Sequence, residues 1–133
     1  MKNIGVATVF AFIVFSATGC GGSDALPSNE RLLSAFADGT TGVWVSGYGT
    51  VVRPLGSSAD NQRFLVQVNG ELSLVVRHQV GDQGPVPADR GDIIAFQGRY
   101  EFHGGGGELI LTHADSGNPG GGGWIEYDGM RYQ

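Results

Sequence analysis

The segment from Val43 to the C-terminus alternates between short apolar runs and clusters of turn-forming residues. Its runs are VWVSGYGTVV, RFLVQV, LSLVVRH, DIIAFQGRY and ELILTH, which are rich in β-branched and aromatic side chains. Such runs favour strands, and the Gly, Pro, Asn and Asp between them favour turns. A last segment, GWIEYDGMRYQ, predicts a hairpin that turns at Asp128-Gly129. This part of the chain is therefore predicted to be all-β.

The order of these runs predicts a particular architecture. A long first strand, a hairpin, a connection and a second hairpin is the strand order of an OB-fold. Gly47 and Gly49 suit a first strand that bends sharply to join both sides of a barrel. The proline-bearing loop 81–90 stands where that fold usually has a helix. We therefore expect a small five-stranded OB-like barrel with a short N-terminal helix and a C-terminal hairpin.

Residues 1–19 have the layout of an export signal, with Lys2 followed by an uncharged apolar run. That run is shorter than the roughly 20 residues of a membrane-spanning helix. Its end, SATGC, leads to Cys20, the only cysteine in the chain. The ending resembles the lipobox of bacterial lipoproteins, which implies acylation of Cys20 and attachment to a membrane, although Ala17 stands where leucine is commonest. The alternative is an ordinary secretory signal followed by a free thiol.

The remaining chain divides into a tether, residues 20–29, and one domain, residues 30–133. At its start, NERLLSAFADG predicts a short helix over 30–38, with Asn29 as its N-terminal cap and Gly39 at its end; the alternative is an ordered coil. Gly21 stands where inner-membrane lipoproteins commonly have an aspartate. We therefore expect an exported, lipid-anchored protein on the periplasmic face, with the outer membrane favoured over the inner.

The Asn69-Gly70 turn decides which side chains face the core. A two-residue turn places Arg63, Leu65 and Gln67 on the face of Leu72 and Leu74, whereas a three-residue loop places Phe64 and Val66 there. The second choice makes a continuous apolar face. We predict the three-residue loop, with Gly70 in the left-handed conformation.

Two histidines end the apolar rows of the predicted third and fifth strands. His78 follows Leu72, Leu74 and Val76 in parity, and His113 follows Leu109 and Leu111. These strands run side by side and parallel in an OB-fold, so both imidazoles are expected at one mouth of the barrel. Asp115 is expected beside them, together with Gln62 or Asp60 at the start of the second strand, whereas His103 is expected on the surface, far from His113. The alternative is two polar strand ends satisfied by backbone carbonyls.

Two histidines and a carboxylate suit a divalent metal such as zinc or manganese, or general acid–base chemistry. The metal ligands would be His78, His113 and Asp115. Secondary candidates are Arg63, Arg77, Glu101 and Trp124. Both arginines point outward by parity, and Glu71 and Glu101 are candidates to pair with them across strands. Trp44 and Trp124 are either half-buried packing residues or surfaces that stack a flat ligand.

The segments NQRFLVQVNG, VVRHQV, GDIIAFQGRYEF, LTHAD and GGGWIEYDGMRYQ together resemble a family of small exported bacterial proteins catalogued as a domain of unknown function. The likeness covers residues 43–133. It matches the family pattern at Gln62, Arg63, His78, Glu101, His113, Asp115 and Trp124. The chain departs at Asn61, Ala114 and Ser116, where the pattern has His, His and Pro. If those histidines are metal ligands in the family, this member binds metal weakly or not at all.

Three functions fit these features. The first is a lipid-anchored binding module for a small polar ligand or an envelope partner. The second is a metal-dependent hydrolase of the phosphodiesterase type that uses the same residues. The third is a structural envelope lipoprotein. Nucleic acid is an unlikely partner, because the formal net charge of −5 does not attract a phosphate backbone.

Overall fold

The computed structural model describes residues 26–58 and 60–133 of the 133-residue chain. The predicted signal peptide and Cys20 lie outside the described residues. Within the described residues, no helix has both the length and the apolar character needed to cross a bilayer. The elements are α1 (Glu30–Asp38), β1 (Val43–Ser58), β2 (Asn61–Gln67), β3 (Ser73–Gln79), β4 (Ile93–Glu101), β5 (Glu108–Ile110), β6 (Trp124–Tyr127) and β7 (Met130–Tyr132).

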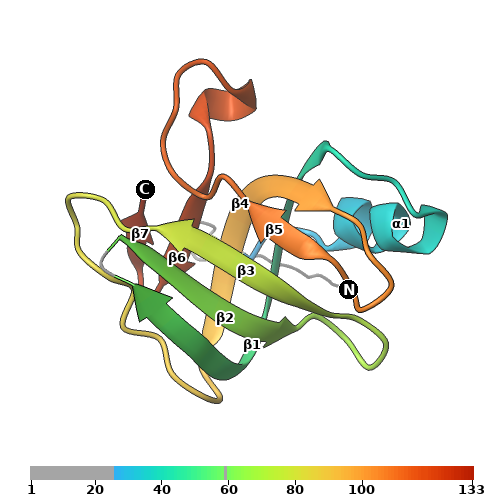
Figure 1. Ribbon diagram of the computed structural model, residues 1–133, viewed down its shortest axis with the longest axis horizontal. Helices are drawn as coiled ribbons and strands as arrows, with labels where there is room; N and C mark the ends of the chain where they lie inside the picture. The colour runs from blue at the N-terminus through green and yellow to red at the C-terminus, as the bar shows by residue number, and fades with distance from the viewer. Residues whose placement is uncertain (1–25, 59) are drawn as a thin grey trace, which may run out of the picture.

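The described strands form a seven-stranded sheet in the order β1-β2-β3-β5-β4-β6-β7. An additional pairing of β1 with β4 bends this sheet into a partial ring. β3 and β5 are parallel neighbours, as predicted from the order of the runs. The sheet has more than the five strands expected, because the C-terminal hairpin joins it through the pairing of β6 with β4. Figure 1 shows β1, β2 and β3 side by side, with α1 at one end of the molecule.

β1 pairs with strands on both sides of the partial ring. Residues 43–50 pair with β4, and residues 50–58 pair with β2. The strand continues well past the predicted apolar run, because RPLGSS pairs with β2 through two register shifts. At Gly49 a Cβ atom would lie 2.6 Å from the carbonyl oxygen of Gln67. Glycine is therefore required where β1 passes close to β2.

The helix α1 has the predicted bounds and closes one end of the core with Leu32, which is fully buried. Gly39 ends it, as predicted, and has the left-handed conformation. The prediction that the Asn29 side chain caps the helix is wrong, because that side chain makes no capping hydrogen bond. Its Oδ1 instead accepts a hydrogen bond of 2.8 Å from the backbone N–H of Tyr48, which ties the start of the helix to β1.

The β2–β3 hairpin has the predicted register. Val66 lies opposite Leu74, Phe64 opposite Val76, and all four side chains are buried. The three-residue loop is confirmed, but its predicted conformation is wrong, because Gly70 does not have a positive φ. The turn is closed instead by Asn69, whose Oδ1 accepts hydrogen bonds from the N–H groups of the two residues after Gly70.

The two remaining connections also follow their sequence signals. The loop 81–90 contains no helix, as predicted, and its Val86 is buried in the core. The C-terminal hairpin turns at Asp128 and Gly129, which both have positive φ (52° and 81°). That pair of conformations is the one that a type I′ turn requires, and Asp-Gly is among the sequences that favour it.

Candidate functional site

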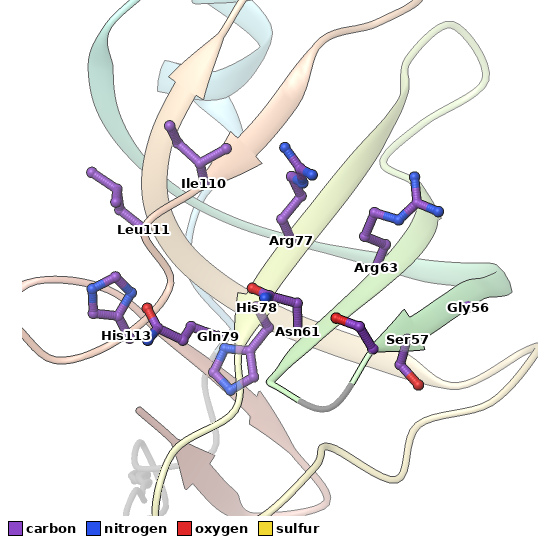
Figure 2. Close-up of a pocket in the computed structure, with 11 residues that line it drawn as sticks. Gly56, Ser57, Asn61, Arg63, Arg77, His78, Gln79, Ile110, Leu111 and His113 are labelled. Atoms are coloured by element: carbon purple, nitrogen blue, oxygen red, sulfur yellow. The ribbon is translucent and has the colours of Figure 1, made fainter.

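A pocket of about 730 Å³ lies where the end of β1 meets β2, β3 and the chain after β5. Outward-facing positions of β2 and β3 form its floor, because the inward positions of both strands belong to the core. Figure 2 shows side chains from these segments gathered around it. The pocket is lined by Gly56, Ser57, Ser58, Asn61, Arg63, Arg77, His78, Gln79, Ile110, Leu111 and His113.

Arg63 and Arg77 are directly opposite each other on β2 and β3. Both are exposed, as parity predicts, and Figure 2 shows their side chains projecting on the same side of the hairpin. Arg63 Nη2 donates to the carbonyl oxygen of Leu55 at 3.2 Å. Arg77 Nη1 lies 3.9 Å from a carboxylate oxygen of Glu108, which is a long and partly exposed contact. Within residues 26–58 and 60–133, neither guanidinium is therefore held by a close carboxylate.

His78 is buried at the inner edge of the pocket, with 1% of its surface exposed. Its Nδ1 lies 2.9 Å from both the carbonyl oxygen and the Oγ1 of Thr112. Thr112 Oγ1 donates its own proton to the carbonyl oxygen of Arg77 at 2.7 Å. Both neighbours of Nδ1 are therefore acceptors, which assigns the proton of the neutral ring to Nδ1. The Nε2 lone pair is left buried, with no partner in the described part of the chain.

The environment of His78 favours the neutral ring. Burial lowers the pKa of His78 below its ordinary value, because the imidazolium form loses hydration. The hydrogen bond to the Thr112 backbone opposes this by raising the pKa, and the nearby imidazole of His113 lowers it further. The net direction is downward, so near neutral pH the neutral ring of His78 is favoured over the imidazolium.

Parity does not predict how the His113 side chain comes to line the pocket. Leu109 is buried as expected, but β5 ends at Ile110 and Leu111 has a φ of 59°. A left-handed residue breaks the alternation of side chains. The next buried residue is consequently Thr112, and His113 is half-buried in the pocket wall. The prediction that His113 ends an inward-facing row is therefore wrong, although His78 and His113 do line one pocket.

Two other predicted site residues have their polar groups engaged elsewhere. Gln62 lies beside His78 in the register, as predicted. Its amide, however, makes two hydrogen bonds with the backbone of Val86, of 3.1 and 2.8 Å, and so fixes the loop 81–90. Asp115 accepts from Gly117 N–H at 2.9 Å and from the Asn118 amide at 3.2 Å. Both groups stabilise loops and do not line the pocket.

The expected metal ligands do not come together as a set. Among the described residues, no group of three His, Cys, Asp or Glu side chains is arranged to hold a metal ion. The physical reason is the local folding of the 111–123 segment. Asp115 N–H donates to the carbonyl of Gly121, and Gly123 N–H donates to the carbonyl of His113. These bonds close the segment on itself and leave the Asp115 carboxylate exposed in its own turn.

The secondary candidates separate into two groups. Arg63 and Arg77 line the pocket, whereas Glu101 and Trp124 do not. Glu101 pairs with Arg99 of its own strand at 2.9 Å, which corrects the expectation that it pairs across strands with the pocket arginines. The ring of Trp124 is covered by the guanidinium of Arg131, 4.1 Å from its centroid.

Other pocket residues are absent from the sequence prediction. Asn61 and Gln79 are opposite each other at the ends of β2 and β3, in outward positions. The predicted register of β2 and β3 is correct, so applying outward parity to the ends of both strands predicts this pair as well. Ser57 and Ser58 were missed for another reason, because the apolar pattern of β1 stops before RPLGSS. His103 is exposed, as predicted, and does not line the pocket.

Comparison with known proteins identifies a family but no better-characterised relative. No curated protein and no solved structure matches the chain. One family model, described as "Protein of unknown function (DUF3465)", matches residues 13–133. This match spans the whole described domain, including every residue of the pocket. The chain therefore belongs to the DUF3465 family.

Proposed function

We propose that this protein is an OB-like binding module that takes a small polar ligand in the pocket beside Arg63, Arg77 and His113. The strand order supports the OB-like description, since β1-β2-β3-β5-β4 with β1 paired to β4 is the circuit of that fold. OB-folds bind ligands on the face of strands 2 and 3 with the adjoining loops. The pocket has the corresponding position, on β2, β3 and the end of β1.

The observation that carries the proposal is the convergence of polar side chains with unused bonding capacity. Asn61, Gln79 and His113 come from three segments, and the hydrogen bonds among the described residues involve none of their side chains. They surround the same cavity as the two arginines. A concave site with a few convergent polar groups is the usual form of a small-molecule site.

The test is a screen of small polar compounds against the purified protein by backbone-amide NMR. We expect bound compounds to shift the amides of Ser57, Ser58 and Asn61 together with those of residues 77–79 and 110–113. Ser57→Trp places an indole in the pocket and should abolish these shifts, whereas the exposed Ser116→Trp is the matched control. Shifts that cluster elsewhere, or a screen without any response, would contradict the proposal and favour a structural role in the envelope.

We also propose that the domain is exported and attached to the outer membrane through acylated Cys20. The support is sequence-based: the signal-like residues 1–19 and the SATGC ending. Metabolic labelling with a fatty acid should mark the wild-type protein and not Cys20→Ser. Unlabelled wild-type protein, released into the soluble fraction, would contradict the anchor.

A metal-dependent hydrolase is the second candidate, and one observation favours it. His78 donates Nδ1–H to a backbone carbonyl while its Nε2 lone pair has no partner in the described chain. Metal-ligating histidines commonly have this arrangement. Stoichiometric zinc or manganese in the purified protein, lost in His78→Gln and retained in His103→Gln, would support this candidate. Metal-free protein with full ligand binding would exclude it.

A further inference from the structure

The charges around the pocket have one sign. The chain as a whole is acidic, with 13 Asp and Glu against 8 Lys and Arg. Yet the residues that line the pocket include two arginines and no carboxylate. Among the described residues, the acidic partner of Arg77 is Glu108 on the neighbouring strand, at 3.9 Å. This is a local cationic site on an acidic protein.

The position of the two arginines has an energetic cost in the free protein. Like charges directly opposite each other in an antiparallel pair are destabilising. Arg63 and Arg77 occupy such a pair, and Arg63 is held by a neutral carbonyl rather than a carboxylate. An anion between the two guanidiniums would relieve this repulsion. Because each arginine carries one positive charge, a dianion would neutralise both.

We infer that the ligand of this pocket carries a phosphomonoester group, bound between Arg63 and Arg77. This inference rests on the proposed function and names the chemical class of its ligand. A phosphomonoester carries roughly −1.5 to −2 charges near neutral pH, and a guanidinium matches its oxygens with paired N–H donors. A carboxylate carries one charge and would leave one arginine uncompensated.

The rest of the pocket suits the polar group that such a phosphate would esterify. The hydroxyls of Ser57 and Ser58 and the amides of Asn61 and Gln79 offer donors and acceptors on one side of the arginine pair. His113 provides a further nitrogen, and Ile110 with Leu111 provides an apolar wall. The ligand is therefore a phosphorylated molecule whose remaining part bears hydroxyl groups.

The experiment is calorimetric titration of the purified full-length protein with three probes: inorganic phosphate, acetate and glycerol. Phosphate should bind more tightly than acetate.

Arg63→Gln and Arg77→Gln should each weaken phosphate binding by about tenfold or more, the loss expected for a charged hydrogen-bonded contact. Arg90→Gln removes an exposed arginine outside the pocket and should leave phosphate binding unchanged. Arg63→Lys and Arg77→Lys keep the positive charge and should weaken phosphate binding less than the glutamine variants do. This comparison separates the loss of phosphate recognition from a loss of folding. Glu108→Gln removes the carboxylate that competes for Arg77 and should tighten phosphate binding.

The outcomes separate the ligand class from the site itself. If glycerol shifts the pocket amides while phosphate binds no better than acetate, the phosphomonoester inference falls and the binding pocket stands. If Arg90→Gln weakens phosphate binding as much as the pocket variants, attraction is nonspecific and the inference also falls. If no probe binds, both the inference and the proposed function fail.

Two sources present this group, a soluble phosphorylated metabolite and a lipid with a terminal phosphate. Phosphatidylcholine vesicles with and without phosphatidic acid distinguish them. Retention that depends on phosphatidic acid and is lost in Arg63→Gln assigns the lipid source. Calorimetric binding of phosphate without such retention assigns the soluble source.

Discussion

The β2–β3 hairpin and the segment that follows β5 each bring one histidine to the same pocket, but by different local geometry. Along β3 the side chains alternate without interruption, so His78 continues the buried row of Leu74 and Val76. After β5 the positive φ of Leu111 shifts the alternation by one residue. Thr112 takes the buried position there, and His113 lies in the pocket wall.

The two histidines therefore have different contacts. His78 joins two segments, because its Nδ1 is bonded to Thr112, which in turn is bonded to the carbonyl of Arg77 on β3. His113 has no such bond in the described chain and is free to meet a ligand. The regular segment thus holds the pocket together, and the irregular one supplies a polar group to its wall.

The largest expected effect tests the regular segment. Phe64→Ala removes a ring that is 2% exposed and should lower the free energy of unfolding by about 3–5 kcal/mol. Its outward neighbour Leu65→Ala should cost much less, because that side chain is only half-buried. Urea denaturation of both variants measures the difference. Equal losses would contradict the assigned register.

The next effect tests the link between the two segments. Thr112→Val keeps the shape of a buried side chain but leaves the Arg77 carbonyl without its donor and removes an acceptor of His78. We expect a loss of about 1–3 kcal/mol in unfolding free energy. Thr50→Val, at an exposed position of β1, should change it by no more than about 0.5 kcal/mol. If Thr112→Val leaves the unfolding free energy unchanged, the proposed link between the two segments is contradicted.

A smaller effect tests the irregular segment itself. A left-handed conformation costs a non-glycine residue about 1–2 kcal/mol, and glycine avoids that cost. Leu111→Gly should therefore destabilise less than Ile110→Gly, by roughly that amount, since both side chains are half-buried. Thermal or chemical unfolding of the two variants provides the comparison. A larger loss for Leu111→Gly would argue against the break in alternation.

The pH dependence of stability tests whether the His78 ring is buried in the neutral form. Because its pKa is lowered on folding, the unfolded chain binds the proton more readily. Stability from this group is complete above the unfolded pKa of about 6.5 and is lost as pH falls towards the lower folded pKa. Unfolding free energy should thus fall on acidification, and His78→Gln should reduce that fall. His103→Gln, an exposed control, should leave it unchanged.

The structure agrees with the sequence pattern where one periodicity holds and departs from it where that periodicity breaks. The bounds of α1, the parallel pairing of β3 with β5 and the burial of Phe64 all follow from regular spacing. The position of His113 does not follow from that spacing, because no sequence signal predicts the left-handed conformation of Leu111. Register and parity predict Gln62 and Asp115 near the site, but their polar groups bond elsewhere. The Gln62 amide bonds to the backbone of Val86, and this partner depends on tertiary packing. The Asp115 carboxylate bonds to Gly117 and Asn118 within its own turn, which the alternation of a strand does not predict.

The central proposal is that a phosphorylated ligand meets the outer pocket, with its phosphate between Arg63 and Arg77 and its polar part beside His113, while His78 stays buried behind them. Nitrogen-15 spectra of the three imidazole rings, recorded with and without glycerol phosphate, a phosphomonoester with free hydroxyl groups, test this proposal. We predict that the His113 ring responds to glycerol phosphate, that the His103 ring does not, and that His78 keeps its proton on Nδ1 throughout. A response of the His78 ring without one from His113, or a His78 proton on Nε2, would contradict the account.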